Sequence, residues 1–165
     1  MDNANLCLFS LMIGPSGAGK SHWLASDAAK SYGIRPSHVI SSDEIRIDLT
    51  GSLFDQSKND RVFQALDRLI YTRIACGLPT TVDATNLHSG NRVAMIRKVD
   101  AIYSGPVRYL VINRPMDEKR RDGGWRNTLD FDLMAKHEAQ FNDSLDMILC
   151  GDRLRNVIVH DLRKS

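Results

Sequence analysis

The stretch Gly14-Pro-Ser-Gly-Ala-Gly-Lys20-Ser21 places the tightest constraint on how this chain can fold. It follows the pattern G-x-x-x-x-G-K-[ST], and it comes directly after the apolar run Leu6–Ile13. Glycines let the main chain wrap closely around a ligand, so that its N–H groups and a helix N-terminus point at phosphate oxygens. The pattern therefore predicts a buried strand, a phosphate-binding loop and a helix, in that order.

This loop predicts that the chain binds ATP together with Mg²⁺. Lys20 is expected to reach the β- and γ-phosphates, and the Ser21 hydroxyl to hold the metal ion. The alternative is a chance glycine turn before a helix. The residues predicted to contact the nucleotide are Gly14, Pro15, Ser16, Gly17, Ala18, Gly19, Lys20, Ser21 and His22.

Short apolar runs alternate with helical patterns along the rest of the chain. We expect strands at Leu6–Ile13, Val39–Ser41, Thr80–Val82, Val107–Ile112 and Val157–Val159. Helices are expected at Ser21–Tyr32, from Asp43 to near Gly51, at Lys58–Cys76, at Asn91–Val99, and along the stripe Met134, His137, Phe141, Leu145 and Ile148. This alternation predicts an α/β fold with a mostly parallel central sheet of about five strands and helices on both faces.

The predicted helix Lys58–Cys76 shows the clearest periodicity. Its apolar side chains recur at helical spacing and are expected to share one buried face; they are Val62, Phe63, Leu66, Leu69, Ile70 and Ile74.

Composition favours an ordinary globular protein. A chain of 165 residues, of which 42% are hydrophobic and 25% charged, predicts a single domain over residues 1–165. The net charge of +2 is too small to predict a polyanionic partner by itself. Three scattered cysteines without C-x-x-C spacing favour reduced thiols in the cytoplasm and no zinc site. We expect no signal peptide and no membrane contact.

The chain lacks signatures of two large classes of nucleotide-binding proteins. It has no guanine-recognising N-K-x-D, and it is short for the coupling elements of a large ATPase. This leaves the small kinases, which pass a phosphoryl group to a substrate hydroxyl, as the class that the sequence favours.

The segment "VISSDEIR" places an aspartate and an arginine just after the second predicted strand, at the sheet edge where ligands bind. Asp43 is either the N-cap of the next helix or a general base that accepts the proton of the acceptor hydroxyl. Arg46 lies three residues on, on the same helix face. It either binds an anionic group of the acceptor or forms a surface ion pair.

The segment "TTVDATN" ends the third predicted strand with Asp83. An acid at this place in a phosphate-loop protein typically serves the metal ion, directly or through water. Thr85 and Asn86 add groups that are expected to face the substrate in the same crevice. The alternative is a turn held by an Asx motif.

The segment from Arg114 to Asn127 is polar and basic, and it contains Gly123-Gly124, so we expect a mobile lid or loop. A lid arginine can neutralise charge on the transferring phosphoryl group. The alternative is a solvated basic loop. Arg126 is the first candidate and Arg121 the second, among the basic residues Arg114, Lys119, Arg120, Arg121 and Arg126.

Taken together, the motifs GPSGAGKS, SSDEIR and VDATN, followed by a basic segment that begins NRP, resemble the 5′-polynucleotide kinases of phage and bacterial end-healing systems. The resemblance runs from about Met12 to the final strand. "VDATNLHSGNR" is close to a strand-plus-helix segment of that family, and "DLMAKHEAQF" resembles the helix after its lid.

This resemblance implies a P-loop kinase fold with a basic lid, and transfer of the ATP γ-phosphate to a 5′-hydroxyl end of DNA or RNA with Mg²⁺. Lys20 and Ser21 match the family's phosphate-loop pair. Asp43 matches its general base, and Arg46 matches the arginine that holds the acceptor's phosphate. Asp83 matches its third-strand acid. The setting implied is the cytoplasm of a bacterial or phage-infected cell.

The sequence departs from that family in its lid, where the arginine spacing differs, and in carrying no phosphatase, ligase or HD module, so such activities would come from separate partners. A D-x-x-R element also occurs in kinases of smaller substrates, including zeta-type toxins that phosphorylate nucleotide sugars. A small-molecule kinase is therefore the alternative function, and the preference between DNA and RNA and the oligomeric state stay open.

Overall fold

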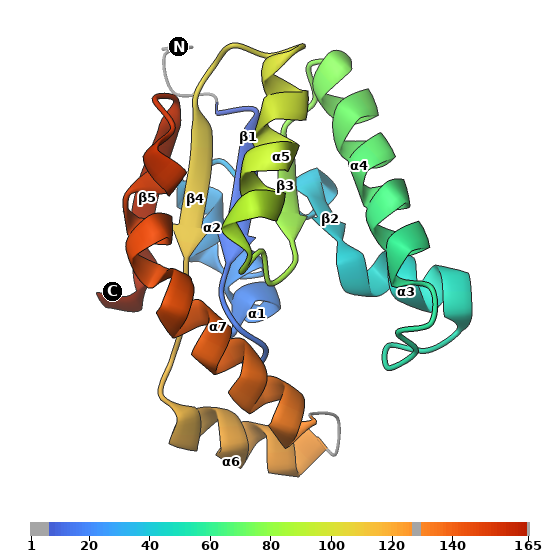
Figure 1. Cartoon of the computed structure of the whole chain (residues 1–165), viewed down its shortest axis with the longest axis vertical. Helices are drawn as coiled ribbons and strands as arrows, with labels where there is room; N and C mark the ends of the chain where they lie inside the picture. Colours follow the sequence, from blue (N-terminus) through green and yellow to red (C-terminus); the bar gives the residue numbers. More distant parts are fainter. Residues whose placement is uncertain (1–6, 127–129, 165) are drawn as a thin grey trace.

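The computed structural model describes the main chain of residues 7–126 and 130–164, and within it five strands form one parallel sheet (Figure 1). The strand order is β2-β3-β1-β4-β5, with every neighbouring pair parallel. The strands are β1 Phe9–Ile13, β2 Val39–Ser41, β3 Thr80–Asp83, β4 Val107–Val111 and β5 Val157–Asp161. The predicted α/β fold with about five parallel strands is therefore confirmed.

Strand β1 lies at the centre of the sheet, between β3 and β4. All five of its residues are buried, which explains why its sequence is almost continuously apolar. The chain leaves β1 towards β2 on one side and later returns to β4 on the other, so the strand order reverses at β1. Ligands of open α/β sheets bind at the carboxyl ends of the strands beside such a reversal.

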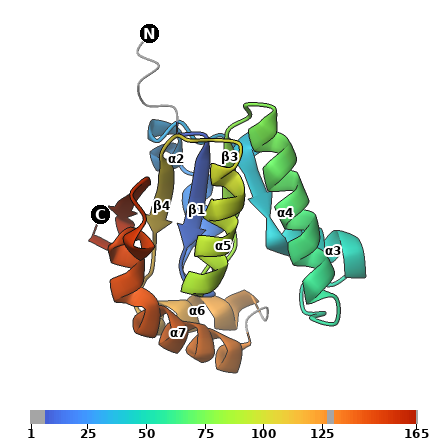
Figure 2. The same cartoon turned by 45° about the horizontal axis from the view of Figure 1, so that its top comes forward.

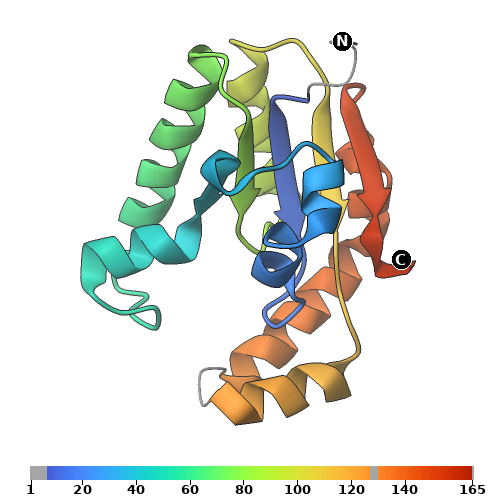
Figure 3. The same ribbon diagram turned by 180° about the vertical axis from the view of Figure 1, so that it is seen from behind.

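Helices cover both faces of the sheet. The helices α4, α5 and α7 lie on one face, in front in Figure 1, while α1 and α2 lie on the other face, in front in Figure 3. The helices are α1 Lys20–Leu24, α2 Asp27–Ser31, α3 Ser42–Thr50, α4 Asn59–Ala75, α5 Ser89–Asp100, α6 Met116–Arg126 and α7 Phe131–Leu149. Over the described ranges, none of these helices has the length and apolar character needed to cross a membrane.

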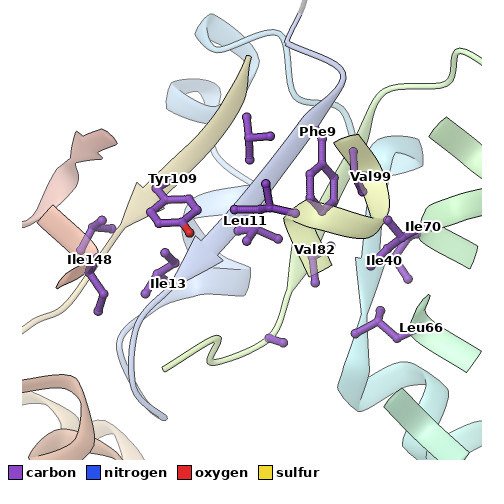
Figure 4. Packing of buried hydrophobic residues seen from close by; sticks show 14 of the residues in the cluster. Phe9, Leu11, Ile13, Ile40, Leu66, Ile70, Val82, Val99, Tyr109 and Ile148 are labelled. Carbon is purple, nitrogen blue, oxygen red and sulfur yellow. The ribbon is translucent and has the colours of Figure 1, made fainter. Parts of the chain in front are cut away.

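The larger of two apolar clusters lies between the sheet and α4, α5 and α7 (Figure 4). Phe9 and Leu11 of β1 stand at its centre, with Val82 of β3 and Tyr109 of β4 beside them. A smaller cluster joins Met12 to the α1–α2 side. Burial on both faces holds β1 rigidly in place, and the phosphate-binding loop begins where β1 ends.

The helix predicted over Ser21–Tyr32 is instead two short helices, α1 and α2. Ser26 has extended main-chain angles (φ −86°, ψ 166°) and is the N-cap of α2. Its hydroxyl donates to the carbonyl of Trp23 at 2.6 Å, which satisfies the end of α1. The Ser26 side chain makes no capping bond to α2, so it is this bond back to α1, together with the extended main chain at Ser26, that interrupts the helix expected from the flanking residues.

The predicted apolar face of α4 is narrower than the sequence suggests. Four residues at four-residue spacing are buried: Val62, Leu66, Ile70 and Ile74. Phe63 and Leu69, which were assigned to the same face, are 46% and 45% exposed. Helix α4 packs beside the edge strand β2, where only one row of side chains meets the core.

The segment predicted as a lid or loop is largely helix α6. It lies against the N-terminal end of α7, on the side of the sheet where the strands have their carboxyl ends (Figure 2). Pro115 precedes the helix and Asp117 and Glu118 occupy its first turn, where negative charge stabilises the N-terminus. These signals outweigh Gly123 and Gly124.

Candidate active site

The phosphate-binding loop joins β1 to α1 in close contact with its neighbours. A Cβ atom on Gly14 would lie 2.2 Å from the Ile112 carbonyl oxygen, so only glycine fits there. The Gly14 N–H donates to the Thr85 carbonyl at 3.2 Å, which ties the loop to the end of β3. Gly17 has a φ of +74°, which favours glycine.

Lys20 lies over this loop. Its ammonium donates to the carbonyl oxygens of Gly14 and Pro15, each at 3.0 Å. Burial lowers the pKa of Lys20, whereas the nearby carboxylates of Asp83 and Asp43 oppose that shift. A cation held among carboxylates at a phosphate-binding loop is placed to bind the phosphates of a nucleotide.

Ser21 and Asp83 meet at the same point from different elements. The Ser21 hydroxyl donates to Asp83 Oδ2 at 2.8 Å. Asp83 ends β3 and is only 8% exposed; burial raises its pKa, while Lys20 and the Ser21 hydroxyl act in the opposite direction. A hydroxyl and a carboxylate beside a phosphate site are suitable Mg²⁺ ligands, because that ion keeps several waters and takes phosphate oxygens for the rest.

No cluster of three or more His, Cys, Asp or Glu side chains suited to a metal occurs among the described residues. A magnesium ion that is held mainly by one hydroxyl, one carboxylate and the phosphates themselves does not need such a cluster. The donor set of Ser21 and Asp83 therefore fits Mg²⁺ bound with ATP.

Asp43 lies in the first turn of α3, but it is not the cap of that helix. The cap is Ser41, whose Oγ accepts from the N–H groups of Asp43 and Glu44 at 3.2 and 3.4 Å. The Asp43 side chain is exposed. Ser41 pairs with Asp83 in the sheet. Asp43 is therefore free of the capping role, and its charge acts on Lys20 and Asp83.

Arg46 is buried, with only 6% of its surface exposed, so it is not the surface ion pair that the sequence allows. One of its terminal N–H groups donates to Asn59 Oδ1, at the start of α4. Asn59 in turn donates to Gln56 Oε1 at 2.7 Å. The contact between α3 and α4 holds the guanidinium one helical turn from Asp43.

Thr85 and Asn86 follow β3 and are half-buried. Both hold the main chain next to the phosphate-binding loop, and the substrate contact that the sequence suggests for them stays a prediction. The Asn86 amide donates to the Met12 carbonyl at 2.7 Å, and Asn86 has a φ of +51°. Thr85 offers its carbonyl to Gly14. The loop after β3 therefore braces the base of the phosphate-binding loop.

Among the described side chains of the basic segment, two cations contact the phosphate-binding loop, and neither is the first choice from the sequence. Arg114 Nε donates to the Gly17 carbonyl at 2.7 Å. Lys119 is 0% exposed, packs against Gly17 and pairs with Glu138 of α7. Arg121 instead has a side chain that is 72% exposed, with Asp117 at 3.9 Å.

Two other predicted residues receive less structural support. The side chain of Arg126 lies outside the part of the chain that the structure describes, so that prediction stays a prediction. His22 lies in α1 with an exposed side chain, next to Ser21.

Helix α7 also reaches the loop. His137 Nδ1 and Ser16 Oγ share a hydrogen bond of 2.7 Å. Burial lowers the pKa of His137, and Lys20 adds to this effect. The sequence places His137 in an otherwise apolar stripe, which predicts packing. The polar residue inside that stripe is the signal that would have pointed to a contact with the site.

A buried ion pair contacts the loop that follows β3. Arg92 of α5 donates from Nε and a terminal nitrogen to both carboxylate oxygens of Asp152, each at 2.7 Å, and both side chains are 0% exposed. Arg92 also donates to the carbonyls of Asn86 and Leu87 at 2.8 and 2.7 Å. The pair therefore fixes the loop after β3. No sequence signal links these residues, which lie 60 positions apart.

Asp152 is further surrounded by donors. Ser89 and Tyr109 hydroxyls donate to it at 2.6 and 2.7 Å. Burial alone would raise the pKa of Asp152, but hydrogen bonds from Arg92, Ser89 and Tyr109 hold it below its ordinary value. The carboxylate is thus kept charged although it is buried.

Comparisons with known proteins agree with this fold. Residues 10–148 match the model of a protein family described as an AAA domain. The fold is similar to a chain in the structure of the Pnkp1/Rnl/Hen1 RNA repair complex, with 17% identity and a TM-score of 0.65 over 88% of this chain and 48% of that chain. The present chain thus spans about half the length of that protein. No curated protein matches it.

A second solved structure, a gluconokinase from Sinorhizobium meliloti 1021, is similar with 15% identity and a TM-score of 0.55, over 93% of this chain and 82% of that chain. At these identities the similarities concern the fold. They confirm the predicted P-loop kinase fold.

Proposed function

The chain belongs to the family described as an AAA domain and has a P-loop kinase fold; on this basis we propose that it transfers the γ-phosphate of ATP to the 5′-hydroxyl end of a polynucleotide. The observation that carries the proposal is the position of α3. This helix carries Asp43, which does not cap it and whose charge acts on Lys20 of the phosphate-binding loop, and one turn later the buried Arg46.

The step requires a base for the acceptor hydroxyl and positive charge at the transferring phosphoryl group. The bond between the γ-phosphorus and the ADP oxygen breaks, a bond from the acceptor oxygen forms, and the hydroxyl proton passes to Asp43. Lys20 binds phosphate oxygens, and Ser21 and Asp83 would hold Mg²⁺. That ion, when bound, neutralises phosphate charge.

The lid contribution is assigned to Arg114 and Lys119 in preference to Arg121. Both contact Gly17 of the phosphate-binding loop, whereas the Arg121 side chain is mostly in solvent. A cation that is already positioned stabilises developing charge without the cost of reorganisation.

Arg46 supports an acceptor that carries a phosphate. A buried guanidinium presents a planar fork that matches phosphate oxygens, and its electrostatic attraction is less screened than at the surface. The 5′-terminal nucleotide of a polynucleotide places a 3′-phosphate at one nucleotide's distance from the reacting hydroxyl. The similarity to a chain of an RNA repair complex is in keeping with such an acceptor.

A small-molecule kinase is the second candidate. It is favoured by the similarity to a gluconokinase, of which 82% of the chain is covered, and by the modest net charge of +2. In that case Arg46 would bind a carboxylate or phosphate of a metabolite.

Phosphoryl transfer from radiolabelled ATP to a panel of acceptors tests the proposal. The panel contains 5′-hydroxyl DNA, 5′-hydroxyl RNA, nucleoside 3′-phosphates, gluconate and a nucleotide sugar, with the Lys20→Ala protein as the control for contaminating kinases. We expect label on the oligonucleotides and, more weakly, on nucleoside 3′-phosphates. Label on gluconate or the nucleotide sugar alone would select the second candidate.

A further inference from the structure

Helix α7 contacts the phosphate-binding loop through two side chains on one face. Met134 packs against Gly17: a Cβ atom there would lie 3.1 Å from Met134 Sδ. One turn later, His137 Nδ1 lies 2.7 Å from Ser16 Oγ. Both Ser16 and His137 are half-buried. A histidine thus touches the interior of the loop from a helix that lies more than a hundred residues away in sequence.

The number of protons at this contact limits what it can do. A serine hydroxyl has one proton to donate, whereas a phosphate oxygen only accepts. If the Ser16 proton goes to His137 Nδ1, the hydroxyl has none for a phosphate. If His137 carries a proton on Nδ1, it donates to Ser16 Oγ, and the Ser16 O–H is free to donate outward.

We propose that His137 is a positioning residue for the phosphates of the bound nucleotide: in the nucleotide complex its Nδ1–H donates to Ser16 Oγ and turns the Ser16 O–H towards a phosphate oxygen. This inference rests on the nucleotide binding included in the proposed function. It concerns how the loop presents its donors, and it applies whichever hydroxyl accepts the phosphoryl group.

The charged groups around His137 give the contact a pH dependence. Lys20 from α1, Lys136 from α7 itself and His88 from the loop after β3 disfavour the imidazolium, and Asp43 from α3 favours it. Together with burial, they lower the pKa of His137 in the free protein. Bound phosphates add negative charge beside Lys20 and raise that pKa. Nucleotide binding therefore takes up protons, and affinity rises as pH falls.

Nucleotide affinity measured by isothermal titration calorimetry with Mg²⁺–ATP between pH 6 and pH 8 tests this assignment. We expect His137→Ala to bind ATP about tenfold more weakly at pH 6, the value for one charge-assisted hydrogen bond. His137→Asn places an amide N–H donor near the position of Nδ1. It should restore most of the affinity at both pH values, but without proton uptake.

Two controls separate positioning from folding. ATP itself titrates near this pH range, so the readout is the difference in pH slope between wild type and His137→Asn. His38, another half-buried histidine with a lowered pKa, lies at the opposite edge of the sheet, and His38→Asn should keep the wild-type slope. In a Ser16→Ala background, His137→Ala should have no further effect on affinity.

The assignment is overturned if His137→Ala binds ATP as tightly as wild type, if His137→Asn is as weak as His137→Ala, or if the pH slope survives in His137→Asn. These outcomes are distinct from failure of the proposed function. Wild-type protein that binds no ATP would contradict both the proposed function and the role of His137. Wild-type protein that binds ATP with the expected pH slope but labels no acceptor would contradict the proposed reaction alone.

Discussion

Two buried arginines in this molecule have opposite surroundings. Arg92, 1% exposed, donates four hydrogen bonds, to two carboxylate oxygens and two carbonyls. Arg46, 6% exposed, donates from one terminal nitrogen to the side-chain oxygen of Asn59. In the described part of the chain no buried side-chain nitrogen or oxygen lacks a partner, so the other nitrogens of Arg46 reach solvent.

The difference distinguishes a group that holds the site from one that can bind a ligand. A fully enclosed guanidinium that uses four of its five N–H groups on protein acceptors fixes its neighbours and offers no donor to a substrate. A guanidinium that is held at one end and hydrated at the other is positioned yet available. Arg92 thus supports the loop after β3, whereas Arg46, one helical turn from Asp43, keeps donors for a ligand.

The largest expected effect concerns stability and lies at Arg92. The Arg92→Met substitution leaves the Asp152 carboxylate buried without its cation, which should cost about 3–5 kcal/mol of unfolding free energy. Chemical denaturation measures this loss. The double variant Arg92→Met, Asp152→Leu removes both charges and should regain a large part of it; a double variant as unstable as the single one would contradict the account.

For Arg46 the expected effect is on acceptor binding. Arg46→Met keeps the apolar stem but removes the charge, and it should raise the acceptor KM by about 10–100-fold, the value of one or two charged hydrogen bonds. Steady-state kinetics with an oligonucleotide acceptor measure it, and the KM for ATP is the internal control. An equal rise in the KM for the acceptor and the KM for ATP would mean that Arg46, like Arg92, supports the fold and does not bind the acceptor.

The basic segment offers a second comparison, between a cation held at the phosphate-binding loop and a cation that lies mostly in solvent. Arg114→Ala should lower kcat/KM for ATP by about tenfold, since Arg114 is held against Gly17 of the phosphate-binding loop. Arg121→Ala should lower it less. Parallel kinetics of the two proteins measure the difference, and a larger loss for Arg121 would mean that α6 shifts when nucleotide binds.

The smallest expected effect is at the start of α3. Ser41→Ala removes the hydroxyl that caps this helix and should cost about 1 kcal/mol of stability. Asp43→Ala should cost less, because its carboxylate accepts neither capping bond. Thermal unfolding compares the two variants. A greater loss of stability in Asp43→Ala than in Ser41→Ala would mean that Asp43 caps the helix.

Local patterns predicted the sheet and the phosphate-binding loop well. The loop depends on glycines at fixed spacing, and β1 on a continuous apolar run, so neighbouring residues contain the information. The break at Ser26 was missed because its hydroxyl bonds back to the Trp23 carbonyl, which the flanking helical pattern does not show. Helix α6 was missed because its acidic first turn competed with Gly123 and Gly124.

Contacts between distant segments could not be predicted in this way. Asp152 meets Arg92 only because η3, Gly151–Arg153, follows α7 and lies beside α5 in the fold. Lys119 and His137 reach the phosphate-binding loop because α6 and α7 cross its end. The sequence prediction ranked Arg126 first and Arg121 second, but a helix directs each side chain by its position, and position 119 faces inward while position 121 faces water.

The central claim is that the protein transfers a phosphoryl group at the carboxyl ends of its strands, with Asp43 as the base. The Arg92–Asp152 pair only supports the loop after β3. The most direct test is the kcat of Asp43→Asn on a 5′-hydroxyl oligonucleotide at saturating ATP, with ATP affinity and unfolding free energy measured on the same protein. We predict that kcat falls by about 10²–10⁴-fold. ATP affinity should stay within about threefold, and stability within about 0.5 kcal/mol. An Asp43→Asn protein that keeps the full kcat would contradict the account.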